Sequence, residues 1–428
     1  MTWSIASGGF ASHPVPLLER ALRTVLSRVA PFAVPLASFY RRWLLGRVTL
    51  LALTGSMGKT TTAACAAAAV GLRRRPSGNN AFGSMLVALF RIRPWQRFAV
   101  IETGIEEPGQ MDRIAAVLQP DLVVVTAIGS SHGRSFRDLA HIAAEKGRLL
   151  DAVRCGGIAV LNIDDPHVRD LARRAPERTV TYGFSPDADI RALRLRLDWP
   201  RGNRLRVAVE GQELELRSAL FGRGMAYAVL AALATAHALG EPLTEAAARI
   251  AGVTPAIMRL DVVRLPSGAW LIRDEFRSNV ETVDAALDLL EEVPGRRFAI
   301  MGGINEPPSP AGPVYRRLGG RLARICEKVA VVGSRSTHQQ FASGARKAGG
   351  DPGRFLRAGH DWRRAVDAIL GDLRTDDVVL VKGRNEQCLA RASLALMGGD
   401  VRCRRTICPL RQGICDGCPS LGRDADAR

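Results

Sequence analysis

An apolar strand, a glycine-rich loop and a helix follow one another near residue 50, and this order limits the folds open to the chain more than any other feature. In LALTGSMGKTTT the apolar run ends at Gly55, and Gly58, Lys59 and Thr60 open an alanine-rich helical segment. Glycines let backbone N–H groups turn toward an anion, a helix N-terminus favours negative charge, and lysine adds a point charge. The spacing GxxGKTT is shorter than the common phosphate loop GxxxxGKS/T, but the strand–loop–helix context predicts a nucleoside triphosphate site. Its predicted contacts are Gly55, Ser56, Met57, Gly58, Lys59, Thr60 and Thr61.

Short apolar runs alternate with helical stretches on both sides of the chain's midpoint. Between 48 and about 190 this alternation predicts a parallel sheet with helices on both faces. Residues 190–220 change to period-two polarity, which indicates an antiparallel annex. Alternation resumes at 269. The predicted fold class is therefore α/β: a parallel-sheet central domain with a phosphate loop and a small antiparallel annex, followed by a second, Rossmann-like α/β domain.

The same patterns predict four segments. Residues 1–47 form a helical N-terminal segment, 48–254 the central nucleotide-binding domain, 255–400 the second α/β domain and 401–428 a cysteine-rich tail. Two interpretations of the first segment stay open. Its helix either packs on the central domain or, being basic and amphipathic, lies on a membrane surface.

Composition narrows the class of protein. The formal net charge is +18, but the basic residues are nearly all scattered arginines, which does not favour nucleic-acid binding. The sequence has no apolar run of the roughly 18 residues that a membrane span needs, and no secretory signal. We therefore expect a cytoplasmic protein. The chain has five lysines, so a lysine at a motif position is more informative here than an arginine would be.

Three polar residues follow the strands next to the phosphate loop. Glu102 closes the second strand in VIETG, His132 follows the third in TAIGSSHG, and Lys146 lies on the next helix in AAEKGRLL. Ligands of open α/β sheets bind at the carboxyl ends of the strands. Because a threonine hydroxyl, a carboxylate and a neutral imidazole can all ligate divalent cations, Thr60, Glu102 and His132 are the predicted Mg²⁺ ligands.

The ordered set GSMGKTTT, ETG with PGQMDRIA, VVTAIG and LNIDDP resembles the central domain of the Mur ligase family, in particular its D-Ala-D-Ala-adding members. Downstream, IMRLDVV, LIRDEFRSNV and VLVKGRNEQ resemble the family's C-terminal domain, so the resemblance covers about 48–398. It implies an ATP- and Mg²⁺-dependent carboxylate–amine ligase. ATP would phosphorylate an acid, and an amine would attack the acyl phosphate to form an amide.

The resemblance also implies roles for individual residues. Lys59, Lys146 and His132 become the catalytic residues, and Lys146 matches the lysine that family members carry as a carbamate. Further ATP contacts are implied at Asn162, Arg259 and Asp274. Substrate contacts are implied at Asn79, Asn80, Asn279 and Lys382.

Three departures from the family pattern bear on the substrates. GRGMAYAVLAA replaces a GxHNxxNALAA-like helix start whose asparagines contact the adenine. RDEFRSNV replaces DDSYNANP, with Glu275, Phe276 and Arg277 as new residues, so we expect an amine other than D-Ala-D-Ala. About 48 residues precede the phosphate loop, fewer than in peptidoglycan enzymes with a domain for the UDP-sugar. We therefore expect an acid other than a UDP-muramoyl peptide.

The tail carries four closely spaced cysteines, Cys403, Cys408, Cys415 and Cys418. Four thiolates at such spacing can ligate Zn²⁺ tetrahedrally, CDGCP is also compatible with an iron–sulfur cluster, and free thiols are the third interpretation. A different functional class stays open as well. The chain could be a P-loop ATPase that has lost ligase activity and whose tail senses metal or redox state.

Overall fold

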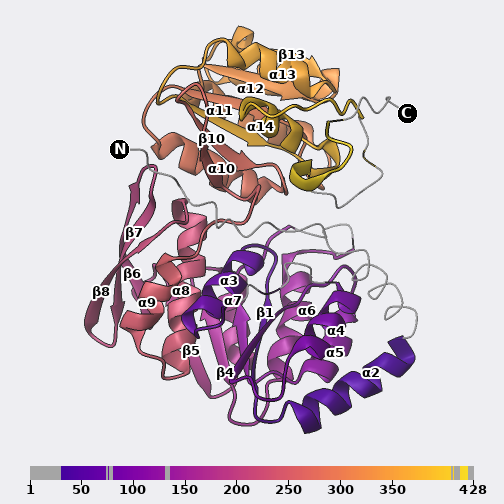
Figure 1. Cartoon of the computed structure of the whole chain (residues 1–428), viewed down its shortest axis with the longest axis vertical. Coiled ribbons are helices and arrows are strands. Elements are labelled where there is room, and N and C mark those ends of the chain that lie inside the picture. Colours follow the sequence, from indigo (N-terminus) through magenta and orange to yellow (C-terminus); the bar gives the residue numbers. More distant parts are fainter. Residues whose placement is uncertain are drawn as a thin grey trace.

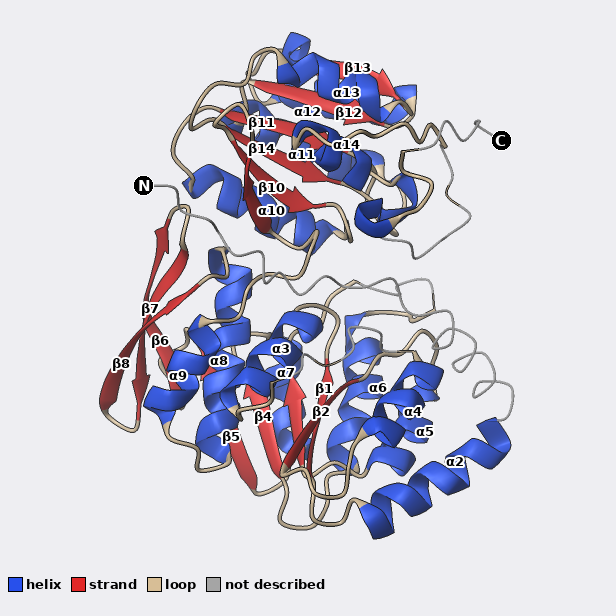
Figure 2. Ribbon diagram, in the orientation of Figure 1, coloured by secondary structure: helices blue, strands red, loops and turns tan. Residues whose placement is uncertain are grey.

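The computed structural model describes residues 30–73, 76, 81–130, 135–405, 408 and 415–422. It contains two α/β bodies, each built on one sheet with helices on both faces (Figures 1 and 2). The first body carries somewhat more than half of the described residues, and the second lies beyond the carboxyl end of β1 (Figure 1). The predicted fold class is confirmed.

The first sheet has eight strands in the order β2-β1-β3-β4-β5-β6-β7-β8. Its strands are β1 (Thr49–Thr54), β2 (Phe98–Glu102), β3 (Leu122–Val125), β4 (Ile158–Asn162), β5 (Arg178–Gly183), β6 (Ile190–Asp198), β7 (Gly202–Val209) and β8 (Gln212–Ser218). Neighbouring strands pair in parallel from β2 through β1, β3, β4 and β5 to β6. Strands β6, β7 and β8 pair antiparallel and form the predicted annex.

Alternate residues of β1 face opposite sides of this sheet, as strand geometry requires. Leu51 and Leu53 enter one core, and Leu50 and Ala52 enter the other. Helices cover both faces because every residue of the strand interior is apolar and buried. These helices are α3 (Lys59–Ala69), α4 (Phe82–Arg91), α5 (Gln110–Leu118), α6 (Leu139–Asp151), α7 (Pro166–Leu171), α8 (Gly222–Ala238) and α9 (Leu243–Ala251).

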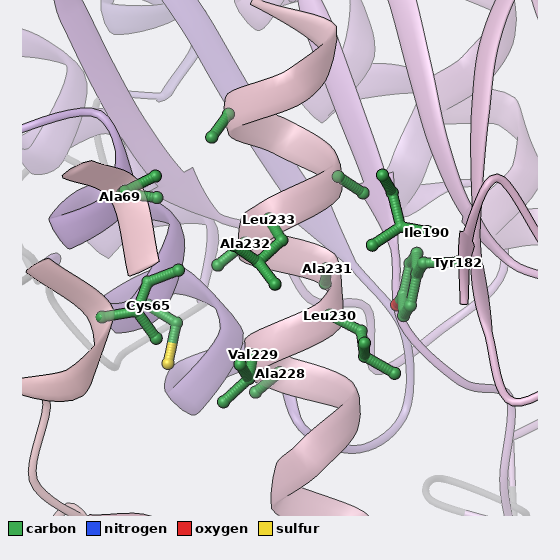
Figure 3. Packing of buried hydrophobic residues seen from close by; sticks show 14 of the residues in the cluster. Cys65, Ala69, Tyr182, Ile190, Ala228, Val229, Leu230, Ala231, Ala232 and Leu233 are labelled. Carbon is green, nitrogen blue, oxygen red and sulfur yellow. The ribbon is translucent and has the colours of Figure 1, made fainter. Parts of the chain in front are cut away.

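The core on the α8 side is built largely from small side chains. Residues Ala226 to Ala236 of α8 are buried almost throughout, and they pack between Cys65 and Ala69 of α3 on one side and Tyr182 of β5 on the other (Figure 3). Alanine at most of these positions lets the two helices approach closely. The helix that begins with the phosphate loop is therefore held rigidly against the sheet.

The second sheet has six strands in the order β13-β12-β11-β14-β10-β9. Its strands are β9 (Asp261–Arg264), β10 (Trp270–Asp274), β11 (Arg297–Met301), β12 (Lys328–Val332), β13 (Phe355–Gly359) and β14 (Val378–Lys382). Only the β9–β10 pair is antiparallel in this sheet. Its helices are α10 (Val280–Glu292), α11 (Gly312–Ile325), α12 (Arg335–Lys347), α13 (Trp362–Leu370) and α14 (Ala390–Leu396).

Helix α2 (Ala30–Phe39) continues into the π-helical turn η1 (Tyr40–Leu44), and both precede β1. The buried Arg41 fixes this element to the first body. Its guanidinium donates to Leu118 O at 2.8 Å and Gln119 O at 2.9 Å, and pairs with Asp121 at 2.7 Å. Burial lowers the pKa of Arg41, and Asp121 opposes that effect. The described part of the N-terminal segment thus packs on the central domain, and residues 1–29 lie outside the described residues.

Candidate active site

The phosphate loop joins β1 to α3 at the carboxyl edge of the first sheet. Lys59 Nζ donates to Gly55 O at 2.7 Å, which folds the lysine back over the loop. Gly58 has φ 77°, a left-handed conformation that suits glycine, and it immediately precedes the first residue of α3. The free N–H groups of the first turn of α3 therefore face the same space as the lysine ammonium.

Close packing against the next strand fixes the shape of the loop. A side chain at Gly55 would place its Cβ 2.0 Å from Thr126 Oγ1, so only glycine fits there. Thr126 Oγ1 donates to Met57 O at 2.6 Å, and Ser56 N donates to Ala127 O at 2.6 Å. Ser56 Oγ is buried without a hydrogen-bond partner among the described residues. A buried hydroxyl lacking a partner inside such a loop fits a phosphate oxygen.

Thr60 and Glu102 meet at the carboxyl ends of β1 and β2. Thr60 Oγ1 donates to Glu102 Oε2 at 2.9 Å, and Glu102 is almost fully buried. Burial raises the pKa of Glu102, whereas the charges of Lys59 and Arg259 lower it. A hydroxyl and a carboxylate are the hard oxygen donors that Mg²⁺ prefers, so these two residues suit the predicted cation.

Lys146 lies on α6 and is 2% exposed. Burial lowers its pKa well below the ordinary lysine value, the positive charge of Lys59 lowers it further, and Glu145 opposes both effects. Glu145 is itself held by the Met111 N–H, which donates to its carboxylate at 3.0 Å. The site therefore favours the uncharged amine of Lys146 and places it within electrostatic reach of the phosphate loop.

Arg259 sits in a strained connection between the two bodies. Its neighbours Met258 and Leu260 have φ of 63° and 51°, values that non-glycine residues adopt at a cost of about 1–3 kcal/mol each. The Arg259 guanidinium lies 4.5 Å from the centroid of the Phe276 ring, and burial lowers its pKa while Glu102 raises it. The connection thus directs a cation of the second body toward the carboxylate of the first.

Asp274 and Lys382 form a buried ion pair at the ends of β10 and β14. Both are register partners, and Lys382 Nζ lies 2.6 Å from Asp274 Oδ2. Lys382 Nζ also donates to Arg277 O at 2.6 Å, and Leu260 N donates to Asp274 Oδ1 at 3.2 Å. Lys382 is fully buried and its hydrogen bonds support this loop, while the substrate contact that the resemblance implies for it stays a prediction.

Glu281 joins the two bodies, and sequence reasoning missed it. Its carboxylate accepts hydrogen bonds from Ser130 N at 2.9 Å and Ser130 Oγ at 3.0 Å. Ser130 lies in the loop after β3, and Glu281 lies in the first turn of α10. A side chain at Gly129 would approach both Met57 and Glu281 closely, so the contact lies directly against the phosphate loop. The sequence gives no signal for it beyond an acidic residue in the first turn of a helix.

We expect Glu281→Ala to loosen this contact between the two bodies. The variant removes both hydrogen bonds from Ser130, and a hydrogen bond to a charged group contributes about 1.5–3 kcal/mol, so we expect kcat/KM for ATP to fall by at least about tenfold. ADP release measures kcat/KM, and small-angle scattering measures the expected increase in radius of gyration. Glu292→Ala, at an exposed position on the same helix, serves as the control. Unchanged scattering and turnover in the Glu281 variant would contradict the prediction.

The remaining predicted site residues differ in placement. Asn162 ends β4, and its side-chain oxygen accepts Asp164 N at 3.2 Å, so it shapes the turn after the strand. Asn279 precedes α10 and is largely buried. His132, Asn79 and Asn80 lie outside the described residues.

The cysteine tail packs against the second body near Arg259. Cys388 and Cys415 share a cluster with Met258, and Cys408 and Phe276 lie against it. The thiol of Cys403 instead accepts a hydrogen bond from Arg391 at 3.6 Å. Within the residues described, no group of three or more His, Cys, Asp or Glu side chains could hold a metal ion. The predicted zinc or iron–sulfur site at Cys403, Cys408, Cys415 and Cys418 is thus not supported. The thiol that lies beside Cys415 belongs to Cys388, whereas Cys403 contacts Arg391.

A buried charge network, also missed from sequence, joins this tail to β10. Arg273 donates to both carboxylate oxygens of Asp416, at 2.7 and 2.9 Å, and to Glu275 at 3.1 Å. Burial raises the pKa of Glu275 to about 7, and the charge of Arg273 opposes the increase. The tail therefore contacts Arg273, which precedes Asp274, while Glu275, which follows Asp274, shares the same guanidinium.

Two family models match the chain in succession: the Mur ligase middle domain over residues 53–236, and the Mur ligase glutamate ligase domain over residues 258–385. The chain belongs to the Mur ligase family. Mur ligases are amide-forming enzymes that use ATP and Mg²⁺, and this Mur ligase is an enzyme of that kind.

Relatives and solved structures agree with this assignment. The Mur ligase described here is 28% identical over 399 residues to the UDP-N-acetylmuramoyl-tripeptide--D-alanyl-D-alanine ligase of Mycobacterium tuberculosis (strain ATCC 25618 / H37Rv), a match covering 88% of this chain and 78% of that enzyme. The enzyme of the same name from Escherichia coli (strain K12) is 27% identical over 318 residues, a match covering 72% of this chain and 69% of that enzyme. The fold is similar to MurF from Acinetobacter baumannii, with TM-score 0.76, 22% identity and coverage of 86% and 80%. MurF ligase from Thermotoga maritima in complex with ADP gives TM-score 0.74, 20% identity and coverage of 85% and 83%.

Proposed function

We propose that this Mur ligase joins a carboxylic acid to an amine through an acyl phosphate formed from ATP. The observation that carries the proposal is the convergence on Glu102 of Lys59 and Thr60 from the phosphate loop and of Arg259 from the second body. A site assembled from both bodies can hold a triphosphate on one side and the acid and amine on the other.

In this mechanism the chain supplies position and charge. Lys59 and the N–H groups of the loop hold the terminal phosphates. An oxygen of the acid attacks the γ-phosphorus, and the bond between that phosphorus and the bridging oxygen of ADP breaks. The amine then attacks the acyl carbon, the carbon–oxygen bond to phosphate breaks, and the nitrogen releases a proton. Mg²⁺ held by Thr60 and Glu102 would neutralise charge on the phosphates.

We further propose that Lys146 reacts with CO₂ to give a carbamate and a proton. The support is its burial and its lowered pKa, because the uncharged amine is the form that adds to CO₂. An anionic carbamate on Lys146 would also attract the nearby Lys59 ammonium.

Lys146→Ala is expected to lower kcat by at least about 10²-fold, since the variant removes an electrostatic group from the site. Short-chain carboxylic acids such as acetate should restore part of the activity by occupying the vacated space. The measurement is ADP release with and without added acid, and Lys347→Ala, at an exposed lysine, is the matched control. Wild-type turnover in the Lys146 variant would rule out the carbamate.

The substrates are proposed to differ from those of the peptidoglycan relatives. Arg277 stands where the family pattern has an uncharged residue, it is exposed, and its charge acts on Lys59, Glu102 and Lys146. An exposed arginine whose charge acts on this site suits a substrate with an anionic group beside its reacting amine or acid. We propose an amine other than D-Ala-D-Ala and an acid other than a UDP-muramoyl peptide.

The test is ADP release from ATP and Mg²⁺ with pools of candidate acids and amines. A ligase requires both co-substrates and forms one amide for each ADP, which mass spectrometry of the products can count. ADP release that is indifferent to both pools would overturn the proposal and favour the P-loop ATPase alternative.

A further inference from the structure

The helix formed by α2 and η1 is apolar on two faces, and the residues that the structure describes bury only one of them. Ala33, Ala37, Arg41 and Leu45 recur every four residues and are buried. They face α4 and α5, against which α2 packs. A surface helix of a globular protein ordinarily turns polar side chains outward from such a stripe.

The outward face instead carries large apolar side chains. Leu36 is 60% exposed, Phe39 55%, Trp43 70% and Leu44 45%. The rings of Phe39 and Trp43 lie with centroids 6.4 Å apart, so they present one aromatic surface. Contiguous exposed apolar surface of this kind marks an interaction site.

A further exposed aromatic residue follows α4, which packs beside this helix. Tyr40 OH donates to Ile92 O at 2.6 Å, and the Tyr40 ring lies 5.6 Å from that of Phe90. Trp95, three residues beyond Ile92, is 80% exposed. We call Leu36, Phe39, Trp43, Leu44 and Trp95 the aromatic patch.

The charge around the aromatic patch is uniformly positive. No acidic residue occurs between Glu19 and Glu102 in the sequence, so every element that carries the patch lacks one. Exposed arginines flank it at Arg42, Arg47, Arg91 and Arg93. The Arg42 guanidinium lies 5.9 Å from the centroid of the Trp43 ring.

Acidic side chains on the helices and loops behind this element are already paired. Asp121 binds Arg41 and Arg154, and Asp151 binds Arg174. They therefore do not offset the positive charge of the four exposed arginines.

We propose that the aromatic patch docks this enzyme on an anionic lipid surface. Tryptophan and phenylalanine rings partition into the headgroup region of a bilayer, and nearby arginines are attracted to anionic lipids. The positive charge favours such a surface over a second copy of this chain, because a symmetric dimer through the patch would bring the same arginines together. Among the described residues no helix is long and apolar enough to cross a membrane, so the contact is peripheral.

The geometry leaves the active site open while the patch is docked. Helix α2 lies at the end of the first body that is remote from the second body (Figure 1). Because η1 precedes β1 and the phosphate loop follows it, the length of that strand separates the two, about 20 Å for six residues. Arg41 holds the helix firmly, so docking would orient the whole first body.

The experiment is co-sedimentation of the full chain with phosphatidylcholine vesicles with or without phosphatidylglycerol. We expect binding only to the phosphatidylglycerol vesicles, and weaker binding as salt rises. Phe39→Ser/Trp43→Ser should lower the partition coefficient at least about tenfold, because two large apolar side chains no longer enter the interface. Leu370→Ser, which removes an exposed leucine on the second body, is the control and should bind as the wild type does.

Arg42→Glu/Arg93→Glu tests the charge independently of the aromatic rings and should abolish the preference for phosphatidylglycerol. Circular dichroism and ADP release verify that each variant is folded and retains its basal turnover. The proposal is overturned if the wild type does not bind phosphatidylglycerol vesicles, or if both double variants bind as the wild type does. A concentration-dependent dimer that the Phe39/Trp43 variant abolishes, without vesicle binding, would overturn it in favour of a second copy of the chain.

Discussion

Lys59→Ala is expected to lower kcat/KM for ATP by about 10²–10³-fold, the typical cost of removing one preorganised electrostatic donor from an active site. Lys59 is the phosphate-loop cation and is held over the loop by Gly55 O at 2.7 Å. ADP release measures the effect, with Lys347→Ala as the lysine control. Retention of even a tenth of wild-type kcat/KM by the Lys59 variant would contradict the proposed role.

A pH dependence follows from the same lysine. Burial lowers the pKa of Lys59 to about 8, and the nearby Arg277 and Arg259 lower it while Glu102 raises it. ATP affinity of the free enzyme should therefore fall as pH rises through about 8, because the loop loses its charge. The same lowered pKa makes the free energy of unfolding increase with pH, whereas the affinity for ATP decreases. The buried ammonium destabilises the folded state below that pH, and this cost disappears between about 8 and the ordinary lysine value of 10.5. Calorimetric titration of ATP across this range measures the first effect.

Lys382→Met is expected to be the most destabilising single change at the site. It removes one partner of a buried ion pair and leaves the Asp274 carboxylate without its cation, which costs about 3–5 kcal/mol of unfolding free energy. The variant should also lose most of its ligase activity, because Lys382 holds the Arg277 carbonyl at 2.6 Å. Urea denaturation measures the stability.

The matched control is Lys328→Met. Lys328 pairs with Asp372 at the surface, where such a pair contributes under about 1 kcal/mol. The loss of unfolding free energy in the Lys382 variant should become smaller as pH falls. Burial already raises the pKa of Asp274, and protonation removes the charge of its carboxylate. Asp274→Asn combined with Lys382→Met should recover part of the stability. Equal losses in the Lys328 and Lys382 variants would contradict this account.

Local patterns were enough to predict both sheets. The phosphate loop and the antiparallel annex depend on residues close together in sequence, whose periodicity or glycine spacing reveals them directly. Glu102 could also be placed, since a residue at the end of a parallel strand must lie at the edge where ligands bind.

Contacts between distant elements could not be predicted in this way. The ion pair of Asp274 with Lys382 depends on the register of β10 against β14, and the Ser130–Glu281 hydrogen bonds depend on how the two bodies meet. The tail shows the same limit, since cysteine spacing alone cannot reveal that Cys388 of the preceding domain lies beside Cys415.

The attachment of Asp416 to Arg273 has a practical consequence for protein production. A form of the chain shortened before Asp416 would deprive the Arg273 guanidinium of the carboxylate that accepts two of its hydrogen bonds, next to the strand end that carries Asp274. A purification tag on the C-terminus should be joined through a long spacer, so that it does not disturb the contact between Asp416 and Arg273. A truncation made for crystallisation that removes the last 13 residues would delete Asp416 and with it this ion pair.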